Sequence, residues 1–119
     1  MSLGRAAIGV ALLVRPELAT SAWIGKPAGK PVGRLLARCL GARDLGVGLG
    51  VLSAYATGAP ARGWLAAGVV ADATDLTATL VERDNLPGGA APMIAALAGG
   101  GIVLGLVGIA AGDEPAAAA

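Results

Sequence analysis

The chain has 119 residues, of which 55% are hydrophobic and 14% are charged, and its formal net charge is +1. Soluble domains carry about 25% charged residues, so this composition favours a membrane protein over a soluble alanine-rich bundle. The small net charge provides no concentrated basic surface, and nucleic acid is not expected as a partner. Histidine is absent and Cys39 is the single cysteine, so no metal, cofactor or hydrolytic triad is expected.

The first apolar segment, residues 3–15, predicts a helix that ends at Pro16, because proline disfavours a helical conformation in the residue before it. Residues 18–24 can add an interfacial turn anchored by Trp23. A secretory signal peptide cleaved near residues 20–22 is the alternative, but Arg5 is the one basic residue at its start, which favours the helix. Residues 25–31 alternate glycine, proline and lysine and predict a loop.

The remaining apolar segments predict three further helices, over residues 32–56, 61–81 and 90–111. The short connection around Gly58 and Pro60 makes the second and third helices antiparallel, and the fourth is long enough to cross a bilayer. Residues 112–119 are expected to form a frayed tail. The predicted fold is all-α: an antiparallel four-helix transmembrane bundle in one domain, multi-pass in the cell membrane, with the lipid bilayer as its surroundings.

Basic residues are distributed unequally between the two sides of this predicted bundle. Arg5 and Arg62 fall on one side, and the other side holds a larger basic set: Arg15, Lys26, Lys30, Arg34 and Arg83. The positive-inside rule therefore predicts that the loops at 25–31 and 82–89 are cytoplasmic and that both termini are outside.

Four charged residues lie in the middle of the predicted apolar stretches: Arg43, Asp44, Asp72 and Asp75. A charge near the bilayer centre costs roughly 2.5–3.5 kcal/mol on insertion scales, so such residues persist mainly where they pair internally or act on a ligand, ion or proton. Counting back from the turn at Gly58 places Asp44 level with Asp75. Two carboxylates at one depth in a low dielectric need a cation between them or a shared proton.

Several arginines are candidates for that cation. Arg38 is expected near Asp75 and Glu82, and Arg5 can enter from the first helix. Arg43 points about 100° around its helix from Asp44, so it is expected to serve another helix or subunit. Asp72 is predicted to face Gly48, which leaves space opposite this carboxylate.

The candidate ligand- or proton-binding residues are therefore Arg38, Arg43, Asp44, Asp72 and Asp75. Three hypotheses follow: a site for a small or lipid-like ligand or a proton, a structural or accessory subunit held together by these charges, and an intramembrane enzyme. The pattern superficially resembles the aspartate motif of CDP-alcohol phosphotransferases. The order of its residues differs from that motif, so this assignment is rejected and no catalytic residue is predicted.

Glycines recur at helical spacing in two segments. Gly46, Gly48 and Gly50 can mimic a phosphate loop, but no strand precedes them, which favours close helix packing. In the fourth helix, one face carries a longer series: Gly101, Gly105, Gly108 and Gly112. This face is expected to pack against another helix of the same subunit, or against a second copy in a homo-oligomer.

Taken together, these features resemble a group of small, uncharacterised four-helix integral membrane proteins common in actinobacteria. The resemblance covers nearly the whole chain and depends on Arg5, Gly9, Pro16, Trp23-Ile24-Gly25, the Arg-Cys-Leu-Gly-Ala-Arg-Asp segment at 38–44, Gly48 and Asp72-Ala73-Thr74-Asp75. It implies an integral membrane bundle and does not imply an activity.

Overall fold

The computed structural model describes residues 2–112, and every regular element in this range is helical. Five α-helices are present: α1 (Ser2–Val14), α2 (Pro16–Ile24), α3 (Pro31–Thr57), α4 (Arg62–Val81) and α5 (Ala90–Gly112), with 3-10 turns η1 (Lys26–Gly29) and η2 (Arg83–Asn85). The predicted all-α class is confirmed. The predicted helices correspond to α1, α3, α4 and α5, and residues 113–119 of the predicted tail lie outside the described residues.

The first predicted helix is one arm of a bent pair, because α1 and α2 meet at an angle of 104°. Pro16 is the first residue of α2, where its fixed φ and missing N–H are tolerated, and Arg15 before it is non-helical. The interfacial turn predicted for residues 18–24 is thus part of a complete helix. With 13 residues, α1 is about 20 Å long and cannot cross a bilayer core of about 30 Å alone.

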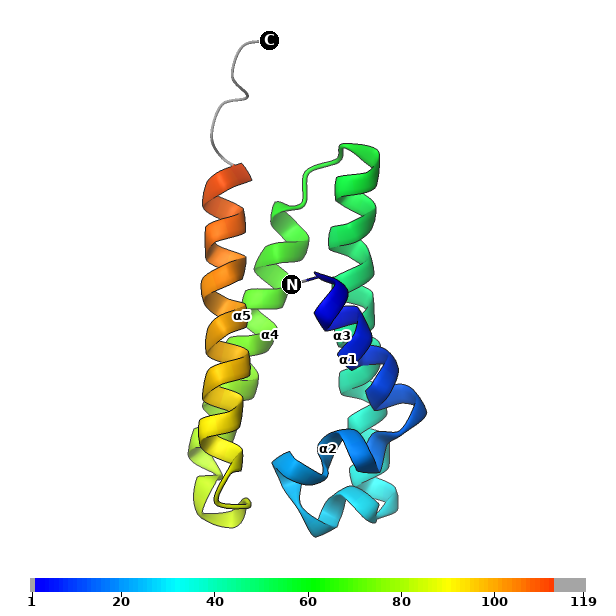
Figure 1. The fold of residues 1–119 in the computed structure, drawn as a ribbon, viewed down its shortest axis with the longest axis vertical. Coiled ribbons are helices and arrows are strands. Elements are labelled where there is room, and N and C mark those ends of the chain that lie inside the picture. Colours follow the sequence, from blue (N-terminus) through cyan, green and yellow to red (C-terminus); the bar gives the residue numbers. More distant parts are fainter. Residues whose placement is uncertain (1, 113–119) are drawn as a thin grey trace.

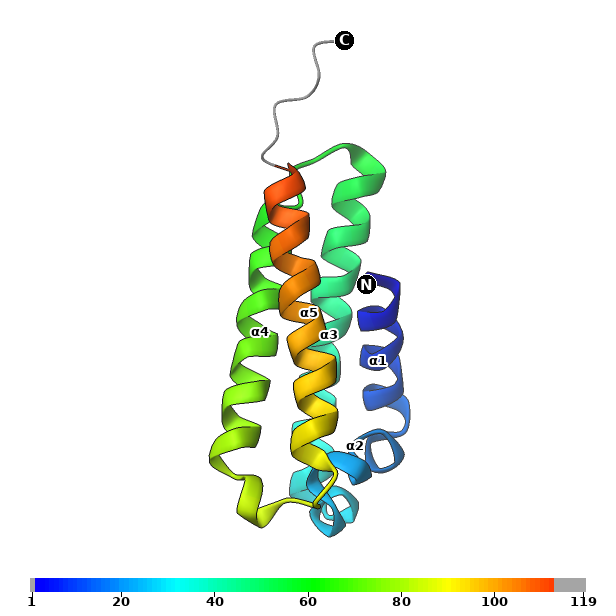
Figure 2. The ribbon, with the colours of Figure 1, turned by 60° about the vertical axis from the view of Figure 1, so that its left-hand side comes forward.

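The four long helices form two pairs (Figures 1 and 2): α1 lies along α3, and α4 lies along α5. Gly58, in the left-handed conformation with φ of 70°, ends α3 and reverses the chain into α4. Near this turn the two pairs touch through a buried apolar cluster of Val51, Ala54, Ala61 and Leu65, joined by Ile109. Over the molecule as a whole α3 packs mainly against α1 and α4 mainly against α5, whereas the sequence predicted that α3 and α4 face each other along their polar faces.

Glycines allow the backbones of α1 and α3 to come into contact. A Cβ on Gly9 would lie 2.7 Å from the carbonyl oxygen of Gly41, and a Cβ on Gly48 would lie 2.9 Å from the backbone nitrogen of Ala6. Gly48 therefore faces α1, and the prediction that it leaves space opposite Asp72 is wrong. The reason is that α1 occupies the side of α3 that the hairpin geometry had assigned to α4.

Two helices, α4 and α5, are long and apolar enough to cross a membrane, and a third span results if the bent pair α1 and α2 counts as one. In α3 the charged residues Arg34, Arg38, Arg43 and Asp44 interrupt the apolar sequence. By length and composition, the described residues therefore contain two or three candidate spans.

Candidate functional site

Arg5 connects the two helix pairs through a buried ion network. Its side chain leaves α1, donates from Nη1 to Asp44 Oδ1 of α3 at 3.0 Å, and donates from Nη2 to Asp72 Oδ2 of α4. Arg5 and Asp44 are each 9% exposed and Asp72 is 7% exposed. Removal from water strengthens such charge-assisted hydrogen bonds, so a single guanidinium holds three helices together at this level.

Arg43 extends the network to Asp75. Its Nη1 and Nη2 donate to the two carboxylate oxygens of Asp75 at 2.9 and 2.6 Å, and its Nη2 also donates to Asp44 Oδ1 at 3.2 Å. The predicted bridge between Asp44 and Asp75 through an arginine is therefore present. Arg43 serves another helix, as expected, and it reaches Asp44 as well because its long side chain turns back along α3.

Three carboxylates and two guanidinium groups make up this Arg/Asp network, which consists of Arg5, Arg43, Asp44, Asp72 and Asp75. Asp75 uses both oxygens on Arg43. Within residues 2–112, Asp44 Oδ2 and Asp72 Oδ1 accept no hydrogen bond, and no buried side-chain oxygen or nitrogen lacks a partner. Asp44 and Asp72 both line the central cavity described next.

The cavity lies between the two helix pairs and has a volume of about 470 Å³. The Arg/Asp network forms one part of its wall. The rest is mostly apolar and comes from α1, α2, α3 and α5, with these large side chains: Ile8, Leu12, Trp23, Leu40, Met93, Ile94, Leu97 and Leu104. Such a shape, with an apolar interior and a few convergent polar groups, is typical of sites for small organic ligands.

Trp23 of α2 is one of the residues that line this central cavity. Its indole nitrogen donates to Thr79 Oγ1 at 2.9 Å, and the Thr79 hydroxyl donates to the carbonyl oxygen of Asp75 at 2.6 Å. The tryptophan predicted as an interfacial anchor therefore links α2 to α4 beside the network. Its ring is directed inward and lines the cavity.

Arg38 does not join the other predicted site residues. Its Nε donates to the carbonyl oxygen of Leu13 at 3.3 Å, and its side chain lies at the protein surface. Glu82, expected near it, accepts a hydrogen bond from Asn85. Arg38 contacts α1 and lines a different cavity with residues of α2 and the bend before it, instead of facing α4.

Two parts of the site were not among the predicted site residues. Arg5 was considered as a possible cation, and its position four residues before the buried Gly9, on the same helix face, is the signal that could have placed it. Gly101 of α5 lies directly against the Asp72 carboxylate, where a Cβ would collide with Oδ2. Gly108 packs against Leu65 in the same way, so this predicted small-residue face serves packing within the subunit at both positions.

Among the described residues, no three acidic or cysteine side chains are grouped closely enough to hold a metal ion. Comparison of the chain with protein-family models, with curated proteins and with solved structures finds no match.

Proposed function

We propose that this protein is a small multi-pass protein of the cell membrane that binds a compact amphipathic ligand in its central cavity. The ligand carries a cationic or hydrogen-bond-donating group, which Asp44 and Asp72 receive, and an apolar body, which the side chains of α1, α3 and α5 cover. We also propose that the protein is related to the small four-helix membrane proteins of actinobacteria that its sequence resembles.

The membrane part of the proposal is supported by α4 and α5, whose lengths and compositions suit a bilayer. It is also supported by the ion pairs of Arg43 with Asp44 and Asp75, which satisfy inside the protein the two charges in the middle of α3. The end of the molecule with α2, η1 and η2 carries the larger basic set, so the positive-inside rule makes this end cytoplasmic.

The observation that carries the ligand part is that the carboxylates of Asp44 and Asp72 line a cavity whose wall, outside the Arg/Asp network, is mostly apolar. With every member of the network ionised, one negative charge has no matching cation inside the protein. A bound cation stabilises this arrangement, and a proton is the smallest cation that does so. An anionic ligand, by contrast, meets carboxylates whose repulsion Arg5 and Arg43 offset only in part.

Compact ligands with one apolar body and different head groups test this proposal. We expect 1-adamantylamine to bind more tightly than 1-adamantanol and 1-adamantanecarboxylate to bind most weakly, because only the amine supplies a positive charge to Asp44 and Asp72. Trp23 lines the cavity, so its fluorescence in a Trp64→Phe background reports occupancy. Asp72→Asn and Asp44→Asn should each weaken amine binding about tenfold, the usual effect of losing a charge-assisted hydrogen bond.

The matched control is Asp84→Asn, which removes the same charge from an exposed position in η2, away from the cavity. It should leave amine affinity unchanged. Equal affinities for the three ligands, or equal effects of the Asp72, Asp44 and Asp84 variants, would contradict the proposal.

A structural role is the competing function, and the bidentate contact of Arg43 with Asp75 favours it for that residue. Asp75→Asn should lower the free energy of unfolding by about 1–3 kcal/mol, because two charge-assisted bonds are lost. Asp72→Asn should cost less, since it removes the surplus negative charge and Arg5 keeps Asp44. Unfolding of the two variants in detergent, followed by circular dichroism, measures the difference; equal losses together with unchanged amine binding would favour a purely structural network.

A further inference from the structure

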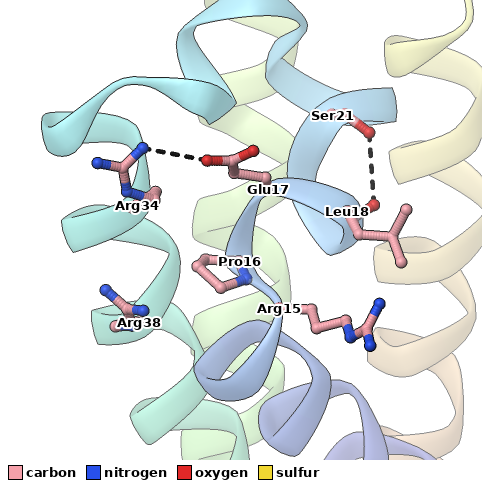
Figure 3. A pocket seen from close by; sticks show the side chains of 7 residues that line it. All are labelled: Arg15, Pro16, Glu17, Leu18, Ser21, Arg34 and Arg38. Atoms are coloured by element: carbon pink, nitrogen blue, oxygen red, sulfur yellow. Dashed lines mark hydrogen bonds and ion pairs between the residues drawn. The ribbon is translucent and has the colours of Figure 1, made fainter.

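A second cavity, separate from the central one, lies at the corner where α1, α2 and the start of α3 meet. Its volume is about 600 Å³, and it opens to the surface (Figure 3). Arg34 and Arg38 line it from successive turns of α3, and Arg15 lines it on the opposite side, from the bend between α1 and α2 (Figure 3). We call it the corner cavity.

Three guanidinium groups and one carboxylate line this corner cavity. Glu17 accepts a hydrogen bond from Arg34 at 3.0 Å, drawn in Figure 3, and this pair is partly exposed. Within the described part of the chain, the terminal nitrogens of Arg38 and the side chain of Arg15 have no hydrogen-bond or ion-pair partner. The corner cavity thus has a surplus of positive charge and several donors that the protein leaves unused.

The backbone adds donors at the same place. Arg15 precedes the first turn of α2, and no side chain caps that turn. The N–H groups of Glu17 and Leu18 belong to this turn, have no acceptor within the helix and lie among the residues that line the corner cavity. Free N–H groups and the positive end of the helix dipole both favour an oxyanion.

We propose that the corner cavity binds a phosphate group, with Arg15 and Arg38 as its charged contacts. Guanidinium groups match phosphate oxygens in geometry and charge, and Arg38 is oriented by its hydrogen bond to the Leu13 carbonyl. Leu18, in the wall of the same cavity, is 71% exposed, so an apolar chain attached to the phosphate finds a surface beside the arginines. Phosphate of a lipid head group and free phosphate share this chemistry, and basic pockets at helix ends suit such head groups.

Binding of three probes to the full chain in dodecyl maltoside micelles separates these sources: dihexanoyl phosphatidic acid, dihexanoyl phosphatidylcholine and inorganic phosphate. Binding of phosphatidic acid that inorganic phosphate does not displace identifies a lipid head group. Displacement by inorganic phosphate identifies a free phosphate site. Both results support the proposal, and phosphatidylcholine, whose phosphate is neutralised by its choline, should bind more weakly in either case.

Arg15→Gln and Arg38→Gln should each lower the affinity for the bound probe about tenfold. Arg83→Gln is the matched control, because Arg83 is exposed in η2 and does not line the corner cavity. Glu17→Gln should raise the affinity roughly threefold by removing a repulsive charge and releasing Arg34, whereas loss of a purely structural ion pair would not tighten binding. Equal affinities for Arg15→Gln, Arg38→Gln and Arg83→Gln, in folded variants with unchanged circular dichroism, would overturn the proposal.

Discussion

Replacement of Arg5 by glutamine is expected to lower the free energy of unfolding by about 3–5 kcal/mol, the cost of removing one partner from a buried ion pair. Asp44 and Asp72 both pair with this guanidinium, and through these ion pairs α1 is tied to α3 and to α4. Glutamine retains two N–H donors but no charge. The two carboxylates would therefore remain buried with only Arg43 nearby, and one of them would have to take up a proton or move into the cavity.

Unfolding of the Arg5→Gln variant by increasing sodium dodecyl sulfate in mixed micelles, followed by circular dichroism, measures this loss. Arg34→Gln provides the comparison, because the Arg34–Glu17 pair is partly exposed and should contribute less than about 1 kcal/mol. The double variant Arg5→Gln/Asp72→Asn should recover part of the stability, since it removes one of the stranded carboxylates. If Arg5→Gln costs no more than Arg34→Gln, the Arg/Asp network does not hold the helix pairs together.

Most helix boundaries could be predicted because local chemistry determines them, whereas α2 was predicted only as an interfacial turn. Pro16 and Pro31 begin α2 and α3, and α2 and α3 end at Gly25 and Gly58, whose positive φ angles glycine adopts readily. These restrictions act within a few residues of each position. No tertiary contact is needed to recognise them.

The pairing of the helices could not be predicted from the turn at Gly58 alone. Matching residues of α3 and α4 by their distance from the turn assumes that the two helices stay in contact along their length. In the structure α1 takes that side of α3, because Gly9 and Gly41 let the two backbones meet. Whether two glycines on different helices face one another depends on how the whole chain packs. It cannot be recognised from the residues around either glycine alone.

The site residues could likewise be predicted only in part from the sequence. Asp44, Asp72, Asp75 and Arg43 come together as a group, since buried charges require partners and few are present. Arg38 was included because it shares a helical face with Asp44, but α2 covers that end of α3 and the arginine meets a different cavity. Arg43 also contacts Asp44, although the two residues point about 100° apart around α3. The four flexible side-chain torsions of arginine allow its guanidinium to reach this neighbour.

Gly9→Ala is expected to destabilise the protein by about 3 kcal/mol, at the upper end of the cost of overpacking. A Cβ at this position would lie 2.5 Å from the backbone nitrogen of Leu45 and 2.7 Å from the carbonyl oxygen of Gly41. Backbone atoms cannot rotate away as a side chain can, so α1 has to move off α3. Arg5 lies one helical turn earlier on α1 and would be displaced from Asp44 by the same movement.

Two glycines of the same helices provide controls with the opposite expected sign. Cβ atoms added to Gly4 in α1 and to Gly46 in α3 meet nothing within 4 Å. Because alanine favours a helix over glycine by about 1 kcal/mol, Gly4→Ala and Gly46→Ala should be neutral or stabilising. Detergent unfolding of the three variants distinguishes close packing from helix propensity: a stability for Gly9→Ala equal to that of Gly4→Ala would show that α1 and α3 do not meet through Gly9. If they do meet there, Gly9→Ala should also weaken binding of 1-adamantylamine, because the network that faces the cavity depends on the position of α1.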